Sequence, residues 1–247
     1  MLNSANKTWE LASAFALALL ALPLSAAEPK SQVFYGVKVE QLEYRFNEIG
    51  EKNDAESWAW DGDAFIGTDE LKLRLQSEGE YIAGEDVFET LENKVVLQIP
   101  VSTFFDAKAG VRFDTPEGPD RTYAVLGLQG LAPQWFEVDA DLFVSEKGDV
   151  SVRLDVDYEL LITNRVILTP TAEINAAFSD DREIGVGSGL SSAELGLRLS
   201  YDLLDRSIAP YIGVHYERLF GNTADFAKDE GEDDDELFVV AGVRLLF

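Results

Sequence analysis

The stretch VSVRLDVDYEL, residues 150–160, alternates apolar and polar side chains without a break. The stretch AELGLRLSYDL, residues 193–203, repeats this period of two, with Glu194, Arg198 and Asp202 on its polar face. Successive side chains of a β-strand point to opposite faces of a sheet, so each stretch predicts a strand with one apolar and one charged face. Such strands fit either a half-buried sheet in a soluble protein or a transmembrane β-barrel.

Strand length and charge placement favour the barrel. The alternating runs are nine to thirteen residues long, whereas strands of globular proteins typically have about five or six residues. A tilted strand needs roughly 9–11 residues to cross a bilayer, and a barrel would place the charged faces in a polar lumen. Aromatic residues near strand ends suit interfacial girdles, with ordinary core aromatics as the alternative: Phe104, Phe105, Trp135, Phe136, Phe178, Phe220 and Phe247.

We therefore expect an all-β fold, a transmembrane antiparallel β-barrel of about twelve strands. The expected strands cover residues 33–46, 57–66, 70–81, 87–99, 104–114, 121–131, 135–145, 149–161, 165–178, 190–203, 209–220 and 237–247. The run 57–66 is the weakest of them because Asp61, Gly62 and Asp63 interrupt it, so ten strands are an alternative. Turns are expected at Thr68-Asp69, Ala132-Pro133, Lys147-Gly148 and Thr163-Asn164.

The first 27 residues have the layout of an export signal. Lys7 precedes an apolar stretch over residues 11–24, which ends in Ser25-Ala26-Ala27. A transmembrane anchor is the alternative, but the stretch is short for a helical span of about 20 residues. We expect a signal peptide over residues 1–27, cleaved before Glu28, and one outer-membrane barrel domain over residues 28–247.

Composition excludes several classes of function. The 247-residue chain has a net charge of −26, which loss of the leader with its one Lys and one Glu would not change. Such a surface repels phosphate backbones, so we expect no nucleic-acid partner and regard cations as the natural ligands. The chain has no Cys, Met1 is its one Met and His215 its one His. Thiolate sites are therefore excluded, and since no nucleophile-and-base pair stands out, we expect no enzyme.

Ten segments carry a more specific signal, and they follow one another in a fixed order. They are residues 42–45 (LEYR), 109–114 (AGVRFD), 121–127 (RTYAVLG), 129–133 (QGLAP), 135–139 (WFEVD), 143–146 (FVSE), 187–191 (GSGLS), 193–198 (AELGLR), 209–211 (APY) and 220–225 (FGNTAD). From about Val33 to Phe247 the chain thereby resembles the copper resistance protein B family of bacterial outer-membrane proteins. The resemblance implies a Gram-negative outer-membrane barrel surrounded by lipid that acts in copper resistance and binds or passes copper ions. It also implies a periplasmic multicopper oxidase as a candidate partner.

One part of the family pattern is missing. Members typically have a segment rich in Met and His between the leader and the barrel, and thioether and imidazole ligands suit Cu(I) and Cu(II). Here residues 28–32 are all that separates the expected cleavage site from the first strand, and none is Met or His. The alternative is therefore a structural or general-solute outer-membrane barrel that has lost copper binding.

The polar faces of the expected strands place charges of both signs in the lumen. The expected lumen-lining residues are Glu137, Asp139, Asp141, Arg153, Asp155, Asp157, Glu159, Glu194, Arg198, Asp202 and Arg244. One interpretation is that ion pairs among them hold the barrel together. The other is a narrow cation path along the acidic excess.

Two places are candidates for metal binding. His215 and Glu217 share one face of a strand, so an imidazole and a carboxylate would meet in the lumen as ligands for Cu(II), although a lone His is also a common structural residue. Residues 221–236 contain eight acids but lack the ligand spacing of a calcium loop. We expect a solvated or disordered loop there, with loose divalent binding at most.

Overall fold

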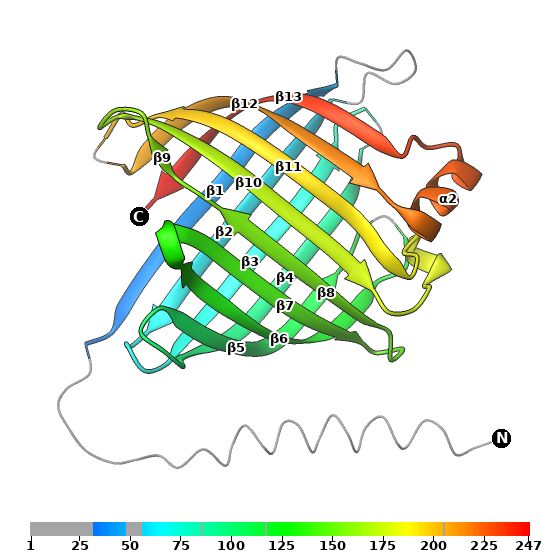
Figure 1. The fold of residues 1–247 in the computed structure, drawn as a ribbon, viewed down its shortest axis with the longest axis horizontal. Helices are drawn as coiled ribbons and strands as arrows, with labels where there is room; N and C mark the ends of the chain where they lie inside the picture. Colours follow the sequence, from blue (N-terminus) through cyan, green and yellow to red (C-terminus); the bar gives the residue numbers. More distant parts are fainter. Residues whose placement is uncertain (1–31, 48–55, 85, 117, 205) are drawn as a thin grey trace, which may run out of the picture. The chain divides into compact units, whose positions relative to one another are not determined.

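The computed structural model describes residues 32–47, 56–84, 86–116, 118–204 and 206–247; the expected signal peptide and its cleavage site lie outside them. Within these residues one antiparallel sheet curls into a barrel of twelve long strands and one two-residue strand (Figure 1). The strands are β1 (Phe34–Asn47), β2 (Ser57–Gly67), β3 (Lys72–Ile82), β4 (Val87–Pro100), β5 (Phe105–Asp114), β6 (Arg121–Ala132), β7 (Phe136–Ser145), β8 (Val150–Asp157), β9 (Leu160–Leu161), β10 (Val166–Ala177), β11 (Gly189–Tyr201), β12 (Ile208–Leu219) and β13 (Asp235–Leu246).

The barrel is closed by its first and last strands. β1 pairs with β13 in a register that sets Lys38 opposite Leu246 and Tyr44 opposite Ala241. The backbone N–H of Val37 donates to the carbonyl of Phe247 over 2.9 Å, and the N–H of Phe247 donates back over 2.8 Å. Closure matters because lipid cannot satisfy the hydrogen bonds of an exposed sheet edge. The predicted barrel is confirmed.

The strand prediction holds with one refinement. The expected strand 57–66, the weakest prediction, corresponds to the regular strand β2. Because β2 pairs along its length with β1 and β3, the ten-strand alternative is wrong. The expected strand 149–161 divides into β8 and β9 because its partner β7 begins only at Phe136, with Glu137 opposite Asp157. Beyond Asp157 the segment pairs with β10 alone.

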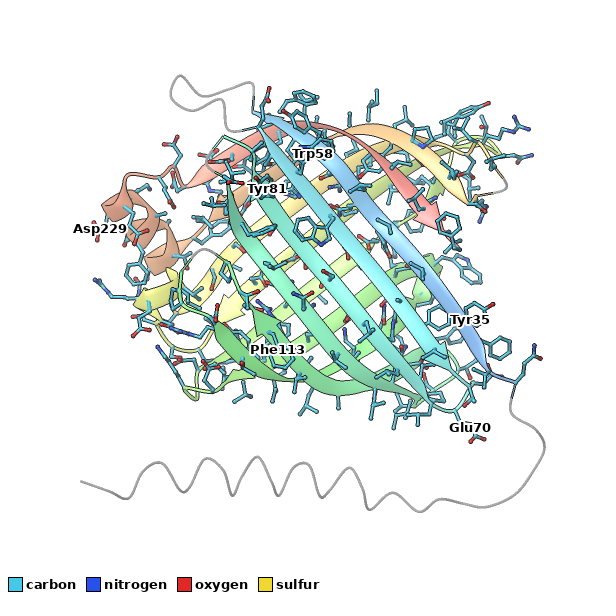
Figure 2. The ribbon with its side chains drawn as sticks, turned by 180° about the vertical axis from the view of Figure 1, so that it is seen from behind. Tyr35, Trp58, Glu70, Tyr81, Phe113 and Asp229 are labelled. Atoms are coloured by element: carbon cyan, nitrogen blue, oxygen red, sulfur yellow. The ribbon has the colours of Figure 1, made fainter. Side chains whose placement is uncertain are left out.

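Side chains alternate between the lumen and the outer wall. On β11, Leu195, Leu197 and Leu199 are 42–55% exposed, whereas Arg198 between them is 5% exposed. The exposed Leu side chains lie on the wall that faces lipid, and the buried Arg lies inside. Figure 2 shows exposed aromatic residues at both ends of the barrel, with Tyr35 at one end and Trp58 and Phe113 at the other.

The two ends of the barrel differ. One, called here the short-turn end, has the tight connections 68–71, 101–104, 133–135 and 162–165, which include all the expected turns except that at Lys147-Gly148. The other, the long-loop end, holds that turn, the 3₁₀-helix Arg182–Ile184 and the helix α2 (Gly221–Glu230), seen beyond β12 in Figure 1. Within the described part of the chain, no helix has the length and apolar character that a membrane crossing requires.

The helix α2 corrects the expectation of a solvated or disordered loop over residues 221–236. Thr223, Ala224, Phe226 and Ala227 form its buried face. Thr223 Oγ1 accepts from the N–H of Gly187 over 2.9 Å, and the Arg182 guanidinium lies 4.5 Å from the Phe226 ring centroid. Gly231 ends the helix with φ 92°, the left-handed conformation that favours glycine. The run of acidic residues after residue 228 made the whole segment resemble a loop in composition, so the short helix was not predicted.

Candidate functional site: the charged lumen

A bulge in β1 determines which of its residues enter the lumen. Register shifts on both sides of the strand fall between Val39 and Glu43. Glu40 and Gln41, although adjacent, both line the lumen. A bulge inserts one extra residue, so the alternation changes phase after it. Even-numbered residues up to Glu40 therefore face inward, and odd-numbered residues from Gln41 onward do so, which turns Glu43 and Arg45 into the interior.

The interior contains a cavity of about 400 Å³ that twelve acidic and seven basic side chains help to line. Nine residues expected to line the lumen do so: Glu137, Asp139, Arg153, Asp155, Asp157, Glu159, Glu194, Arg198 and Arg244. Asp141 and Asp202 are buried but do not border this cavity. Further charged residues that line it were not anticipated: Lys38, Glu40, Arg45, Asp61, Asp63, Glu92 and Lys94. The paired polar residues Glu40-Gln41 are the local signal that would have revealed the phase change in β1.

The first ion-pair network is centred on Glu43, whose exposure is 0%. Its carboxylate accepts two hydrogen bonds of 2.8 Å from Arg198, one of 2.9 Å from the hydroxyl of Tyr211 and one of 3.1 Å from Arg45. Arg45 also donates to Glu80 over 2.6 Å. Two guanidinium groups thus share one buried carboxylate. The hydrogen bonds that they donate compensate its negative charge.

A second network joins the opposite wall. Arg153 Nη2 lies 2.9 Å from Glu92 Oε1, its Nη1 lies 3.1 Å from Glu78 Oε2, and its Nε lies 3.1 Å from Glu173 Oε1. Arg112 pairs with Glu92 as well, and its guanidinium carbon lies 4.6 Å from the Phe143 ring centroid. Charges and an aromatic ring therefore occupy this part of the interior together.

Apolar residues also point inward. Val96, Tyr123, Val125 and Phe143 form one buried cluster, and Tyr211, Phe238 and Val240 form another. They come from β4, β6 and β7 in the first cluster and from β12 and β13 in the second. Together with the ion pairs, these clusters narrow the lumen beyond what the strand number alone would leave.

The acidic excess of the cavity is not fully paired. Within the described residues, four acids that line the cavity form no ion pair with Lys or Arg: Asp61, Asp155, Asp157 and Glu194. The other acids that line it share a limited set of basic groups. Asp155 instead contacts Glu173, another carboxylate. A low-dielectric space with surplus carboxylates attracts cations, so this lumen is chemically suited to bind a cation.

His215, the one histidine of the chain, places an imidazole in this acidic interior. It is 5% exposed, and its Nε2 lies 3.4 Å from Glu194 Oε2. Neither ring nitrogen has a hydrogen-bond partner among the described residues, so the contact with Glu194 is in ion-pair range without hydrogen-bond geometry. Glu217 lies opposite Glu194 in the β11–β12 register, one pair along from His215 and Gly196 in the inward-facing series.

The expected pair of His215 and Glu217 thus gains a third member, Glu194, which makes the direct contact. The described residues contain no group of three or more His, Cys, Asp or Glu side chains already arranged to hold a metal ion. The donors are nonetheless of a suitable kind, because a buried imidazole without a hydrogen bond is costly and a metal ion would satisfy it.

Comparison with known proteins identifies the family. The family described as "Copper resistance protein B precursor (CopB)" matches residues 33–247, nearly all of the described barrel. The chain belongs to the copper resistance protein B family. Its closed barrel and its family together place the protein in the outer membrane of a Gram-negative cell, where lipid surrounds the apolar wall.

This chain spans about two thirds of the length of two copper resistance protein B relatives that it matches. It is 40% identical over 217 residues to the copper resistance protein B of Escherichia coli, an alignment that covers 88% of this chain and 71% of the relative. It is 42% identical over 195 residues to a copper resistance protein B homolog of Pseudomonas syringae pv. tomato, covering 79% of this chain and 65% of that protein.

A solved structure supports the fold independently of the copper resistance protein B relatives. The barrel resembles the NanC porin with a TM-score of 0.53 and 13% sequence identity, over 83% of this chain and 98% of the porin. At this identity the likeness concerns the barrel fold alone.

Proposed function

We propose that the protein acts in copper tolerance at the outer membrane by binding Cu(II) in its lumen, with copper as cargo. His215 would supply the nitrogen ligand, and Glu194 and Glu217 the oxygen ligands. The observation that carries this proposal is the buried imidazole of His215, which has no hydrogen-bond partner within the described residues and lies 3.4 Å from a carboxylate. Among divalent first-row ions, Cu(II) binds mixed nitrogen and oxygen sites most strongly.

The rest of the lumen supports capture of a cation more than rapid flow. The surplus acids would raise the local concentration of positive ions. The ion pairs around Glu43 and Arg153 and the apolar clusters leave a cavity of about 400 Å³, so a passing ion would exchange ligands along its way. Passage of copper in either direction would then be slow and coupled to binding. No step of this proposal requires covalent catalysis.

The direct test is a titration of the purified barrel with Cu(II). His215→Ala should remove most of the Cu(II) binding, and Glu137→Gln, at the exposed rim of the lumen, should leave it nearly unchanged. Binding to the wild-type protein should weaken as pH falls, because a protonated imidazole cannot coordinate. Cu(II) binding that is absent from the wild-type protein, or indifferent to His215, would refute the assignment.

A second candidate function is a structural or general-solute barrel that no longer binds copper. The observation in its favour is the density of buried ion pairs, which can serve to hold the strands together. A deletion strain separates the two candidates, since only the copper function predicts growth inhibition at elevated copper. A periplasmic multicopper oxidase would be the partner in that system, and its gene beside this one would support the copper function.

A further inference from the structure

We propose that Arg45 determines which cations the site at His215 accepts, by excluding divalent ions that bind carboxylates alone. This inference rests on the proposed role of His215 as a metal ligand and adds the basis of selectivity. It arises from the bulge at Glu40, which turns Arg45 into the lumen.

Carboxylates from several strands gather between His215 and the long-loop end. Glu217 lies within electrostatic range of Glu194, Glu80 and Glu89. Glu89 in turn lies within electrostatic range of Glu80, Glu236 and Glu232. Glu80 and Glu217 each lie two residues from the end of their strands, β3 and β12, and Glu236 is the second residue of β13. Without a compensating charge, so many carboxylates would attract Ca²⁺, Mg²⁺ or Mn²⁺, which prefer oxygen ligands.

Arg45 supplies a fixed positive charge in this cluster. Its side chain donates to Glu80 over 2.6 Å and to Glu43 over 3.1 Å, and it is 9% exposed. It also acts electrostatically on Glu89, Glu194 and Glu217. Its guanidinium carbon lies 5.8 Å from the Phe238 ring centroid, and that centroid is 6.3 Å from the His215 ring. Arg45 and His215 therefore both lie next to Phe238, which places the guanidinium near the proposed metal site.

The charge of Arg45 affects the binding of hard divalent ions and of Cu(II) to different extents. A hard divalent ion gains mainly electrostatic attraction to carboxylates, and Arg45 reduces that gain by repulsion and by occupying carboxylate oxygens. Cu(II) meets the same repulsion but also forms a bond to the imidazole nitrogen, which Arg45 leaves untouched. Selectivity is a difference between affinities, so it changes only where the two ions lose unequally. By occupying carboxylate oxygens, Arg45 removes ligands from an ion that binds carboxylates alone, whereas Cu(II) keeps the imidazole nitrogen and therefore loses a smaller part of its affinity.

The experiment measures Mn²⁺ binding to the purified full-length barrel in detergent by electron paramagnetic resonance, with Cu(II) titrated in parallel. We expect Arg45→Gln to bind Mn²⁺ at least about tenfold more tightly than the wild-type protein, because a charge close to a divalent ion is removed. Arg45→Lys should stay near wild type. Arg74→Gln is the matched control, since Arg74 is another lumenal arginine but pairs with Asp63, Gln98 and Gln129 instead. Adding Glu217→Gln to Arg45→Gln should abolish the gain.

Each outcome bears on the inference separately from the copper function. Unchanged Mn²⁺ affinity in Arg45→Gln, or an equal gain in Arg74→Gln, overturns the role of Arg45. A gain in Mn²⁺ affinity without Cu(II) binding in either protein supports Arg45 and refutes the copper site. Should Arg45→Gln fail to reach the folded form in a gel-shift assay, Glu80→Gln provides the second test. Glu80→Gln removes one of the acids that Arg45 binds. The double variant Arg45→Gln/Glu80→Gln must then bind Mn²⁺ more tightly than Glu80→Gln alone, and equal Mn²⁺ affinities in the two would overturn the role of Arg45.

Discussion

Replacement of Glu43 by Gln tests whether the lumenal ion pairs hold the barrel together. The carboxylate has no solvent exposure and binds Arg198, Arg45 and the hydroxyl of Tyr211. Gln has nearly the same shape and keeps one acceptor oxygen, so the substitution removes the charge with little change in packing. Arg45 would retain the carboxylate of Glu80, whereas Arg198 would have only neutral acceptors, which include Gln41 and Thr171.

The expected cost follows from that uncompensated guanidinium. Breaking a buried ion pair by removing one partner costs about 3–5 kcal/mol, because the remaining charge stays buried without its counter-ion. The double variant Glu43→Gln/Arg198→Met should regain part of that loss, since a neutral pair of similar volume avoids the buried charge. Glu159→Gln, which disrupts a partly exposed pair with Arg244, should cost about 0–1 kcal/mol.

The assay is denaturant unfolding of the barrel in lipid vesicles, followed by tryptophan fluorescence and by the mobility difference between folded and unfolded forms on gels. The free energy of unfolding is compared for the wild-type protein, Glu43→Gln, Glu159→Gln and Glu43→Gln/Arg198→Met. A loss below about 1 kcal/mol for Glu43→Gln, or no recovery in the double variant, would refute the reasoning that the buried charges depend on one another.

Three further outcomes are expected. Leu197→Arg should cost about 2–4 kcal/mol in the same unfolding assay, because Leu197 is 42% exposed on the lipid-facing wall well inside β11, and a variant as stable as wild type would show that this facing is wrong. The backbone N–H of Ser188 and the amide of Asn222 donate to Asp180 and hold its pKa below the usual value. Their contribution is therefore complete above the ordinary Asp pKa of about 3.9 and is lost as pH falls through the lowered pKa. The hydrogen-exchange protection factors of residues 178–188, which are corrected for the intrinsic pH dependence of exchange, should therefore fall only in strong acid, and a fall already near pH 6 would contradict this. The barrel should have negligible Cu(I) affinity in a competition assay, because no Cys or Met follows Met1, and tight Cu(I) binding would mean that other ligands had been overlooked.

Period-two alternation predicted the strands well because lipid outside and charge inside impose opposite demands on neighbouring residues. Leu197 and Arg198 show both demands at adjacent positions of β11. The prediction failed where the period changes within an element. At Glu40 the bulge shifts the phase, so Glu43 and Arg45 became visible as lumenal residues only in the structure. The apolar residues of α2 have helical spacing, but the helix has only 10 residues and acidic residues surround it. The sequence pattern therefore did not indicate a helix there.

Pairing between lumenal charges lay beyond sequence reasoning for a different reason. Glu43 and Arg198 are 155 residues apart, and their contact depends on barrel closure and on the stagger between strands. No local pattern records either quantity. His215 was recognisable as the one histidine, but its neighbour Glu194 was identified only by the β11–β12 register, which sets Glu194 opposite Glu217.

The bond between Glu43 and Arg198 has a consequence for the order of assembly. Glu43 is on β1 and Arg198 on β11, and β13 and β12 lie between them in the closed sheet. The two side chains therefore cannot meet until the last strand has joined the first, and until then each charge needs water. Long-range contacts of this kind form late and slow the folding of β-proteins. A nascent barrel should accordingly keep Glu43 and Arg198 hydrated until the seam closes, and the pairing of β1 with β13 should be the step at which these two side chains exchange water for each other.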